Sequence, residues 1–295
     1  MMMRRGLVVL VVSLGSTLCF GAGPPRVLTW ADTLQGSADL PLRWPTAVAA
    51  ASNEELAIVD AYDPRLLRFR KVGVSWQVSD VISLAGHAAD LVYDGSAYVA
   101  SLRTVKELVA FAGDPLEERR INLPPNVVPG SLAVSAAGGY LLFDLRGQRV
   151  LRLNRNGQVQ QQVAVGAHVT ALVEESSGGF LAAVADRGQV RRYNANWRAT
   201  ETWDLPGAAP VPAWPVGLAV DTTGSTYVVD RHSGRILVLA RRGSVAGIGA
   251  NQGWEPGLLL FPSGIAILPN GLLVVADEGG GRAQLFRRSD RGSTP

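Results

Sequence analysis

The chain has 295 residues, with 28 basic and 25 acidic side chains and a formal net charge of +3. This length suffices to bury a sizeable core. So small a charge excess provides no strong basic field for phosphate groups, and we exclude nucleic acid as a partner. A single cysteine also excludes a fold held together by internal disulfides.

The N-terminus carries a short basic start followed by an apolar stretch. Arg4 and Arg5 precede the apolar residues 6–20, and small residues and prolines come directly afterwards. This layout is typical of a secretory signal peptide and is too short to span a membrane, although a buried N-terminal helix is the alternative. We expect residues 1–22 to be removed and the mature chain to be periplasmic or extracellular. Cys19 leaves with this segment, which excludes thiol chemistry.

One pattern recurs six times along the rest of the chain. Each unit begins at an anchor, usually proline, and contains short apolar runs separated by Gly, Asn, Asp and Ser. The anchors lie at positions 45, 88, 129, 169, 215 and 262. In four units the second run ends at an aspartate that is followed by an arginine five positions later: Asp60 and Arg65, Asp144 and Arg149, Asp230 and Arg235, and Asp277 and Arg282. Ser101 with Lys106 and Asp186 with Gln189 stand for this pair in the two degenerate units.

Each unit reads as a small antiparallel sheet. Apolar runs rich in Val, Ile, Leu and Tyr predict strands, and "NG" and "DG" pairs predict hairpin turns. A fourth, more polar run closes most units, as expected of an outer strand that meets water. Six such units predict an all-β, six-bladed β-propeller of four-stranded antiparallel blades over residues 26–290.

The last unit lacks its outer strand. Residues 287–295 are polar and have no strand pattern, so we expect a disordered tail. The stretch "RVLTWA" at residues 26–31 belongs to no unit. We predict that it completes the last blade and thereby closes the ring.

Two units have a recognisable family pattern. "PVGLAVDTTGSTYVVDRHSGRILVL" and "FPSGIAILPNGLLVVADEGGGRAQLF" resemble NHL repeats. The resemblance implies a six-bladed propeller with a central channel, but it implies little chemistry, because the family mixes protein-binding, RNA-binding and enzymatic members. Because the Asp–Arg pair recurs in most units, we interpret it as a structural support of the fold and not as a catalytic site.

The residue before each anchor should lie on the rim of the channel. These positions are Trp44, His87, Val128, His168, Trp214 and Phe261. Asp90 should lie near the same rim, whereas His232, in a hairpin turn, should lie away from it. We expect Trp44, His87, Asp90, His168, Trp214 and Phe261 to form a binding surface.

Two functions follow from this rim. The first is an exported, monomeric, non-catalytic scaffold that binds a protein, peptide or glycan at the channel face and needs no cofactor. The second is a metal-dependent lyase or hydrolase that resembles peptidyl-α-hydroxyglycine amidating lyase, a propeller in which histidines of alternating blades hold zinc. By that resemblance His87 and His168 would be metal ligands. Trp214 and Phe261 cannot supply a third ligand, whereas Asp90 could.

Overall fold

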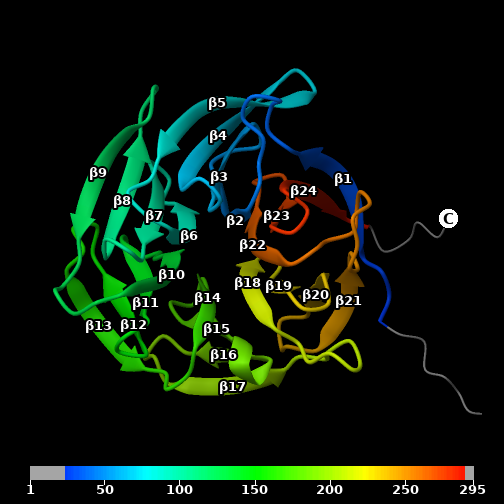
Figure 1. Ribbon diagram of the computed structural model, residues 1–295. Helices are drawn as coiled ribbons and strands as arrows, with labels where there is room; N and C mark the ends of the chain where they lie inside the picture. The colour runs from blue at the N-terminus through cyan, green and yellow to red at the C-terminus, as the bar shows by residue number, and fades with distance from the viewer. Residues whose placement is uncertain (1–23, 290–295) are drawn as a thin grey trace, which may run out of the picture.

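The computed structural model describes residues 24–289. The expected signal peptide, residues 1–22, lies outside this range. Within it the chain forms six four-stranded antiparallel sheets in a ring, and a single turn of 3-10 helix, η1 (Ala185–Arg187), is the only helix (Figure 1). The predicted all-β, six-bladed propeller is therefore confirmed. None of the described residues belongs to a helix that is long and apolar enough to cross a membrane.

The blades follow the order of the sequence, and in each blade the first strand is innermost. Blade 1 consists of β2 (Pro45–Ala50), β3 (Glu55–Asp60), β4 (Arg65–Val72) and β5 (Ser75–Ser83). Blade 2 consists of β6 (Ala88–Tyr93), β7 (Tyr98–Leu102), β8 (Glu107–Ala112) and β9 (Glu117–Asn122). Blade 3 consists of β10 (Pro129–Val134), β11 (Tyr140–Asp144), β12 (Arg149–Leu153) and β13 (Val159–Ala164).

The second half of the ring repeats this plan. Blade 4 consists of β14 (Val169–Glu174), β15 (Phe180–Val184), β16 (Gln189–Tyr193) and β17 (Ala199–Asp204). Blade 5 consists of β18 (Pro215–Val220), β19 (Thr226–Asp230), β20 (Arg235–Leu239) and β21 (Val245–Gly249). Blade 6 consists of β22 (Pro262–Ile267), β23 (Leu273–Asp277), β24 (Arg282–Arg288) and β1 (Leu28–Leu34). All six innermost strands begin at the anchors of the sequence repeat.

The hydrophobic core consists of six clusters, one between each pair of neighbouring blades. Because side chains alternate across a strand, the second strand of each blade contributes side chains to two of these clusters. In β3, Leu56 and Ile58 pack toward blade 6, whereas Ala57 and Val59 pack toward blade 2. The second strands are therefore apolar on both faces, and the outer strand β5 instead alternates between exposed and half-buried positions.

The ring is closed by the N-terminal strand β1, which pairs antiparallel with β24 (Figure 1). The predicted completion of the last blade is confirmed. Leu28 packs into the cluster between blades 5 and 6, and Leu34 packs into the cluster between blades 6 and 1. One expectation is corrected: Arg287 and Arg288 belong to β24 and pair with Thr29 and Leu28, so the polar tail does not start at residue 287. The main-chain pairing with β1 keeps these residues in a strand although their side chains are polar.

Candidate functional site

One face of the ring, which we name the entry face, carries the predicted rim residues. It is the face on which the six innermost strands begin. The hairpin between the second and third strand of each blade lies on the same face, because Pro45 pairs with Asp60 and Asp60 pairs with Arg65. Residues from both segments therefore build this surface.

Buried aspartates hold the rim backbone in place. The carboxylate of Asp60 accepts a hydrogen bond from the Trp44 amide at 3.0 Å, and Asp230 accepts one from the Trp214 amide at 2.9 Å. Asp144 holds Val128 in the same way at 3.1 Å. Because these charge-assisted hydrogen bonds are strong, each buried carboxylate fixes the backbone position of its rim residue.

Each of these aspartates also forms an ion pair with the arginine five positions later. The N···O distances are 3.0 Å for Asp60 and Arg65, 3.0 Å for Asp144 and Arg149, 3.5 Å for Asp230 and Arg235, and 2.9 Å for Asp277 and Arg282. All four aspartate side chains are fully buried. Burial raises the pKa of Asp277, and the Leu260 amide and Arg282 oppose the shift.

The arginines extend this support to the loops between blades. Arg65 donates to the Pro41 carbonyl, and Arg235 donates to the Pro206 carbonyl. The Asp60–Arg65 and Asp230–Arg235 pairs thus each tie a hairpin, a rim residue and an interblade loop together, which is a role in the fold.

Blades 2 and 4 lack this device. Leu102 pairs with Glu107 in blade 2, and Val184 pairs with Gln189 in blade 4. Ser101 and Asp186, which take the place of the aspartate in the sequence pattern, therefore do not occupy the equivalent site. The same two blades carry His87 and His168, and both histidines are exposed.

The histidines do not assemble a metal centre in the described structure. Across residues 24–289, no three His, Cys, Asp or Glu side chains are grouped so that they could hold a metal ion. His87, His168 and Asp90 thus do not converge.

Blades 5, 6 and 1 carry five rings that we name the aromatic half of the entry face. Three of them are exposed and two are half-buried: Trp44, Tyr62 and Phe261, and Trp214 and His232. Trp44 is 53% exposed, Tyr62 is 48% exposed and Phe261 is 45% exposed. Trp44 meets the Tyr62 ring edge-to-face, with 5.3 Å between the ring centroids.

His232 belongs to this surface, contrary to the sequence-based expectation. Its imidazole stacks on the Trp214 ring with 5.1 Å between centroids. The hairpin that carries it turns back over the rim residue of its own blade. The sequence spacing predicted the position of this hairpin along the chain but not that it folds back over Trp214.

An ion pair lies against Phe261. Arg231 contacts Glu278 at 2.8 Å, donates to the Phe261 carbonyl at 3.0 Å and lies 5.7 Å from the centre of the Phe261 ring. The backbone φ of Phe261 is 51°, a left-handed value that is rare for a bulky residue. The Arg231–Glu278 pair was not identified from the sequence. The only sequence signal was that these residues directly follow the second-strand aspartates.

The other three blades carry free positive charge, which we name the basic half of the entry face. Its residues are exposed and lie on the hairpins of blades 2, 3 and 4: Arg103, Lys106, Arg146 and Arg187. None of them forms an ion pair with another residue in the range 24–289. The entry face thus carries most of its exposed aromatic rings on blades 6 and 1, beside Arg43, and these four basic side chains on blades 2, 3 and 4, beside Asp186.

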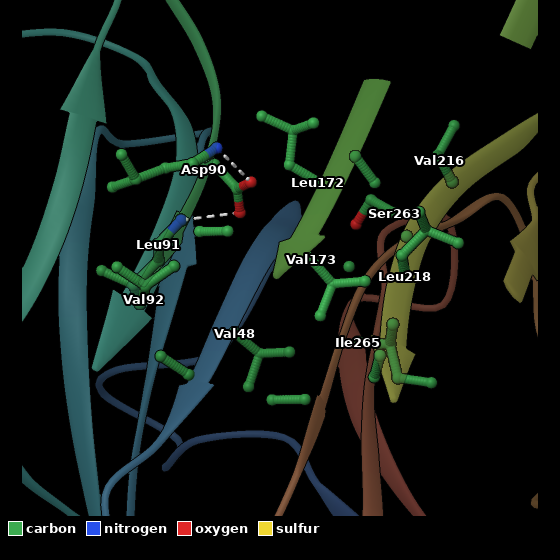
Figure 2. Close-up of a pocket in the computed structure, with 18 of the residues that line it drawn as sticks. Val48, Asp90, Leu91, Val92, Leu172, Val173, Val216, Leu218, Ser263 and Ile265 are labelled. Atoms are coloured by element: carbon green, nitrogen blue, oxygen red, sulfur yellow. Dashed lines mark hydrogen bonds between the residues drawn. The ribbon is translucent and has the colours of Figure 1, made fainter. Parts of the chain in front are cut away.

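Below the rim, the channel contains a cavity of about 310 Å³ that is lined by the innermost strands of all six blades. Figure 2 shows Asp90 in its wall, with apolar side chains such as Val48, Leu172, Leu218 and Ile265 around it. Asp90 accepts hydrogen bonds from the Leu91 amide at 2.8 Å and the Leu132 amide at 2.9 Å. Burial raises the pKa of Asp90 to about 6, although these amides and Ser131 oppose the shift.

The propeller fold is shared with solved structures of low sequence identity. A virginiamycin B lyase from Staphylococcus aureus, solved with quinupristin, aligns at 12% identity over 89% of this chain and 100% of its own, with a TM-score of 0.65. The WD40 propeller domain of Doa1 aligns at 12% identity over 90% of this chain and 98% of its own, with a TM-score of 0.64.

A protein of unknown function from Bacteroides thetaiotaomicron aligns at 14% identity over 90% of this chain and 77% of its own, with a TM-score of 0.67. The sequence matches no protein-family model and no curated protein. At these identities the likeness shows the six-bladed propeller fold and leaves the NHL resemblance an expectation.

Proposed function

We propose that the chain is an exported, monomeric, non-catalytic binding module that captures a protein, peptide or glycan on its entry face. One observation carries this proposal. Trp44 and Tyr62 of blade 1 and Phe261 of the neighbouring blade 6 expose about half of their surface on the same face of the ring. Soluble proteins rarely leave such large rings together in water unless a partner covers them.

The support beneath the rings strengthens the proposal. The backbone of Trp44 and Trp214 is held by buried aspartates, and Phe261 is held by Arg231. Rigid, pre-positioned side chains lose little entropy on binding. Trp, Tyr and Arg are also the residues that dominate binding energy at interfaces, and the basic half adds four cationic side chains.

The alternative of a metal-dependent lyase or hydrolase has less support. His87 and His168 supply only two ligands, and no third His, Cys, Asp or Glu joins them within the described range. The lyase named among the similar structures shares the fold at 12% identity, and this likeness carries no reaction to the present chain.

The proposal is tested by replacing Trp44, His87, His168 and Trp214 together with alanine. The purified variant should retain its thermal unfolding midpoint but lose at least tenfold in capture from periplasmic and culture-medium fractions. Trp30, which is 46% exposed on the outer strand β1, provides the matched control, and Trp30→Ala should capture as the parent does. Undiminished capture by the fourfold variant would refute the site.

The same preparations decide the metal question. Elemental analysis of the parent protein should find no stoichiometric metal ion. A stoichiometric metal that disappears in the variant without His87 and His168 would favour the lyase or hydrolase instead.

A further inference from the structure

The channel cavity contains one charged group in an otherwise uncharged wall. Of its lining residues only Asp90 carries a charge, and Tyr93 is the only other side chain that can titrate. The rest of the wall is made mainly of Val, Leu, Ile and Ala from the innermost strands (Figure 2). A cavity of about 310 Å³ lies at the small end of the range that holds organic ligands.

The Asp90 carboxylate has neutral donors but no cation. Its partners are the Leu91 and Leu132 amides and the Ser131 hydroxyl. No arginine, lysine or histidine of residues 24–289 forms an ion pair with it. Buried charges in proteins are normally paired, so this carboxylate is unusual.

Asp90 is a half-buried residue in the cavity wall, so the fold has removed part of its hydration. The free arginines of the entry face lie on the hairpins between second and third strands, farther from the axis than the innermost strand that bears Asp90. Asp90 is therefore the charged residue that a ligand meets in the cavity wall.

We propose that the channel cavity binds a primary ammonium group carried on an apolar body, with Asp90 as its counter-ion. The ammonium donates to the Asp90 oxygens, and the alkyl part contacts the apolar wall. Because the fold has already desolvated the carboxylate, the ligand gains an ion pair in a site of low polarity. The ammonium belongs either to a free alkyl amine or to a lysine side chain of a partner docked on the entry face. The proposal does not depend on the binding role of the rim.

The competing explanation is that Asp90 only ties β6 to β10. Innermost strands of neighbouring blades share no ladder, and the Asp90 carboxylate satisfies an amide on each of them. A purely structural tie predicts no preference of the cavity for cations over neutral molecules of the same shape.

The experiment measures binding of n-hexylammonium and of the neutral analogue 1-hexanol to the full chain at pH 7 by calorimetry. We expect saturable binding of hexylammonium that weakens at least tenfold in Asp90→Asn, with hexanol binding unchanged. Asp94→Asn is the matched control, because Asp94 lies in a hairpin outside the cavity and accepts a hydrogen bond from Tyr140. That variant should bind hexylammonium as the parent does.

A second measurement covers the case in which Asp90→Asn does not fold. With a pKa of about 6, the Asp90 carboxylate loses most of its charge between pH 7 and pH 5. Hexylammonium affinity of the parent should therefore fall about tenfold over this interval, while hexanol affinity stays constant. Absence of saturable hexylammonium binding, or equal binding by Asp90→Asn, overturns the proposal.

The source of the ammonium is distinguished with lysine blocked at both its amino and carboxyl ends. Affinity similar to that of hexylammonium supports a lysine side chain as the natural ligand. Affinity at least tenfold weaker supports a free amine, because the blocked backbone then does not fit the mouth of the channel.

Discussion

At the scale of single residues, carboxylates of this propeller differ according to what surrounds them. Asp60, Asp144, Asp230 and Asp277 are fully buried, yet each has an arginine and a backbone amide at or beside the rim as partners. Asp90 has only neutral donors. The first group holds the entry face in shape, whereas Asp90 introduces an unpaired charge into the channel.

Asp90 should make stability depend on pH. Its pKa in the folded chain, about 6, lies above the ordinary value of 3.8. The folded state therefore binds a proton more tightly than the unfolded state, and stability from this group is complete below pH 4 and is lost as the pH rises through 6. We expect a loss of up to about 3 kcal/mol, measured as the difference between parent and Asp90→Asn in urea unfolding at pH 4 and pH 7.

Asp94 provides the contrast for this measurement. Burial opposes its ionisation, but hydrogen bonds from Ser96 and Tyr140 outweigh burial and lower its pKa. Removing Asp94 should therefore change stability with the opposite dependence on pH. If Asp90→Asn shows the same pH profile as the parent, Asp90 is not desolvated as described.

At the scale of elements, β1 contributes more than main-chain pairing. Its residue Leu34 is 2% exposed and packs against Leu67 and Leu285 in the cluster between blades 6 and 1. The strand therefore joins the last blade to the first through side chains as well as closing β24.

Leu34→Ala should lower the free energy of unfolding by about 2–4 kcal/mol, because it removes buried methyl groups and leaves a cavity between two rigid sheets. Urea unfolding monitored by tryptophan fluorescence measures this loss. Val81→Ala on the outer strand β5 is the control, since Val81 is 38% exposed and should change stability by less than about 0.5 kcal/mol. Equal effects of the two changes would mean that β1 is only loosely packed.

At the scale of the whole molecule, every blade depends on two neighbours. The six core clusters lie between blades, so a ring with one missing element exposes apolar surface on both sides of the gap. The channel and the entry face exist only while the ring is closed, because each needs residues from all around the axis.

Removing residues 24–34 should therefore abolish cooperative unfolding and cause aggregation through the exposed edge of β24. Circular dichroism melting and size-exclusion chromatography measure these effects. A synthetic peptide of residues 24–36 added in trans should restore part of the transition. A sharp transition with an unchanged midpoint in the shortened chain would show that blade 6 is stable without its outer strand.

The sequence by itself determined the fold of this protein. The anchors at 45, 88, 129, 169, 215 and 262 are the first residues of the six innermost strands. This was predictable because strand periodicity, turn residues and repeat length are local properties of the chain. Even the closure by β1 could be inferred, because one unit lacked a strand and one unassigned run remained.

Only the tertiary structure decided which side chains meet. It brought His232 onto Trp214, placed Arg231 against the Phe261 ring, and put the Asp90 carboxylate between two blades in the wall of a cavity. These contacts depend on side-chain rotamers and on distances between blades, which strand spacing leaves open. The division of the entry face into an aromatic and a basic half likewise appears only when residues from all six blades surround one axis.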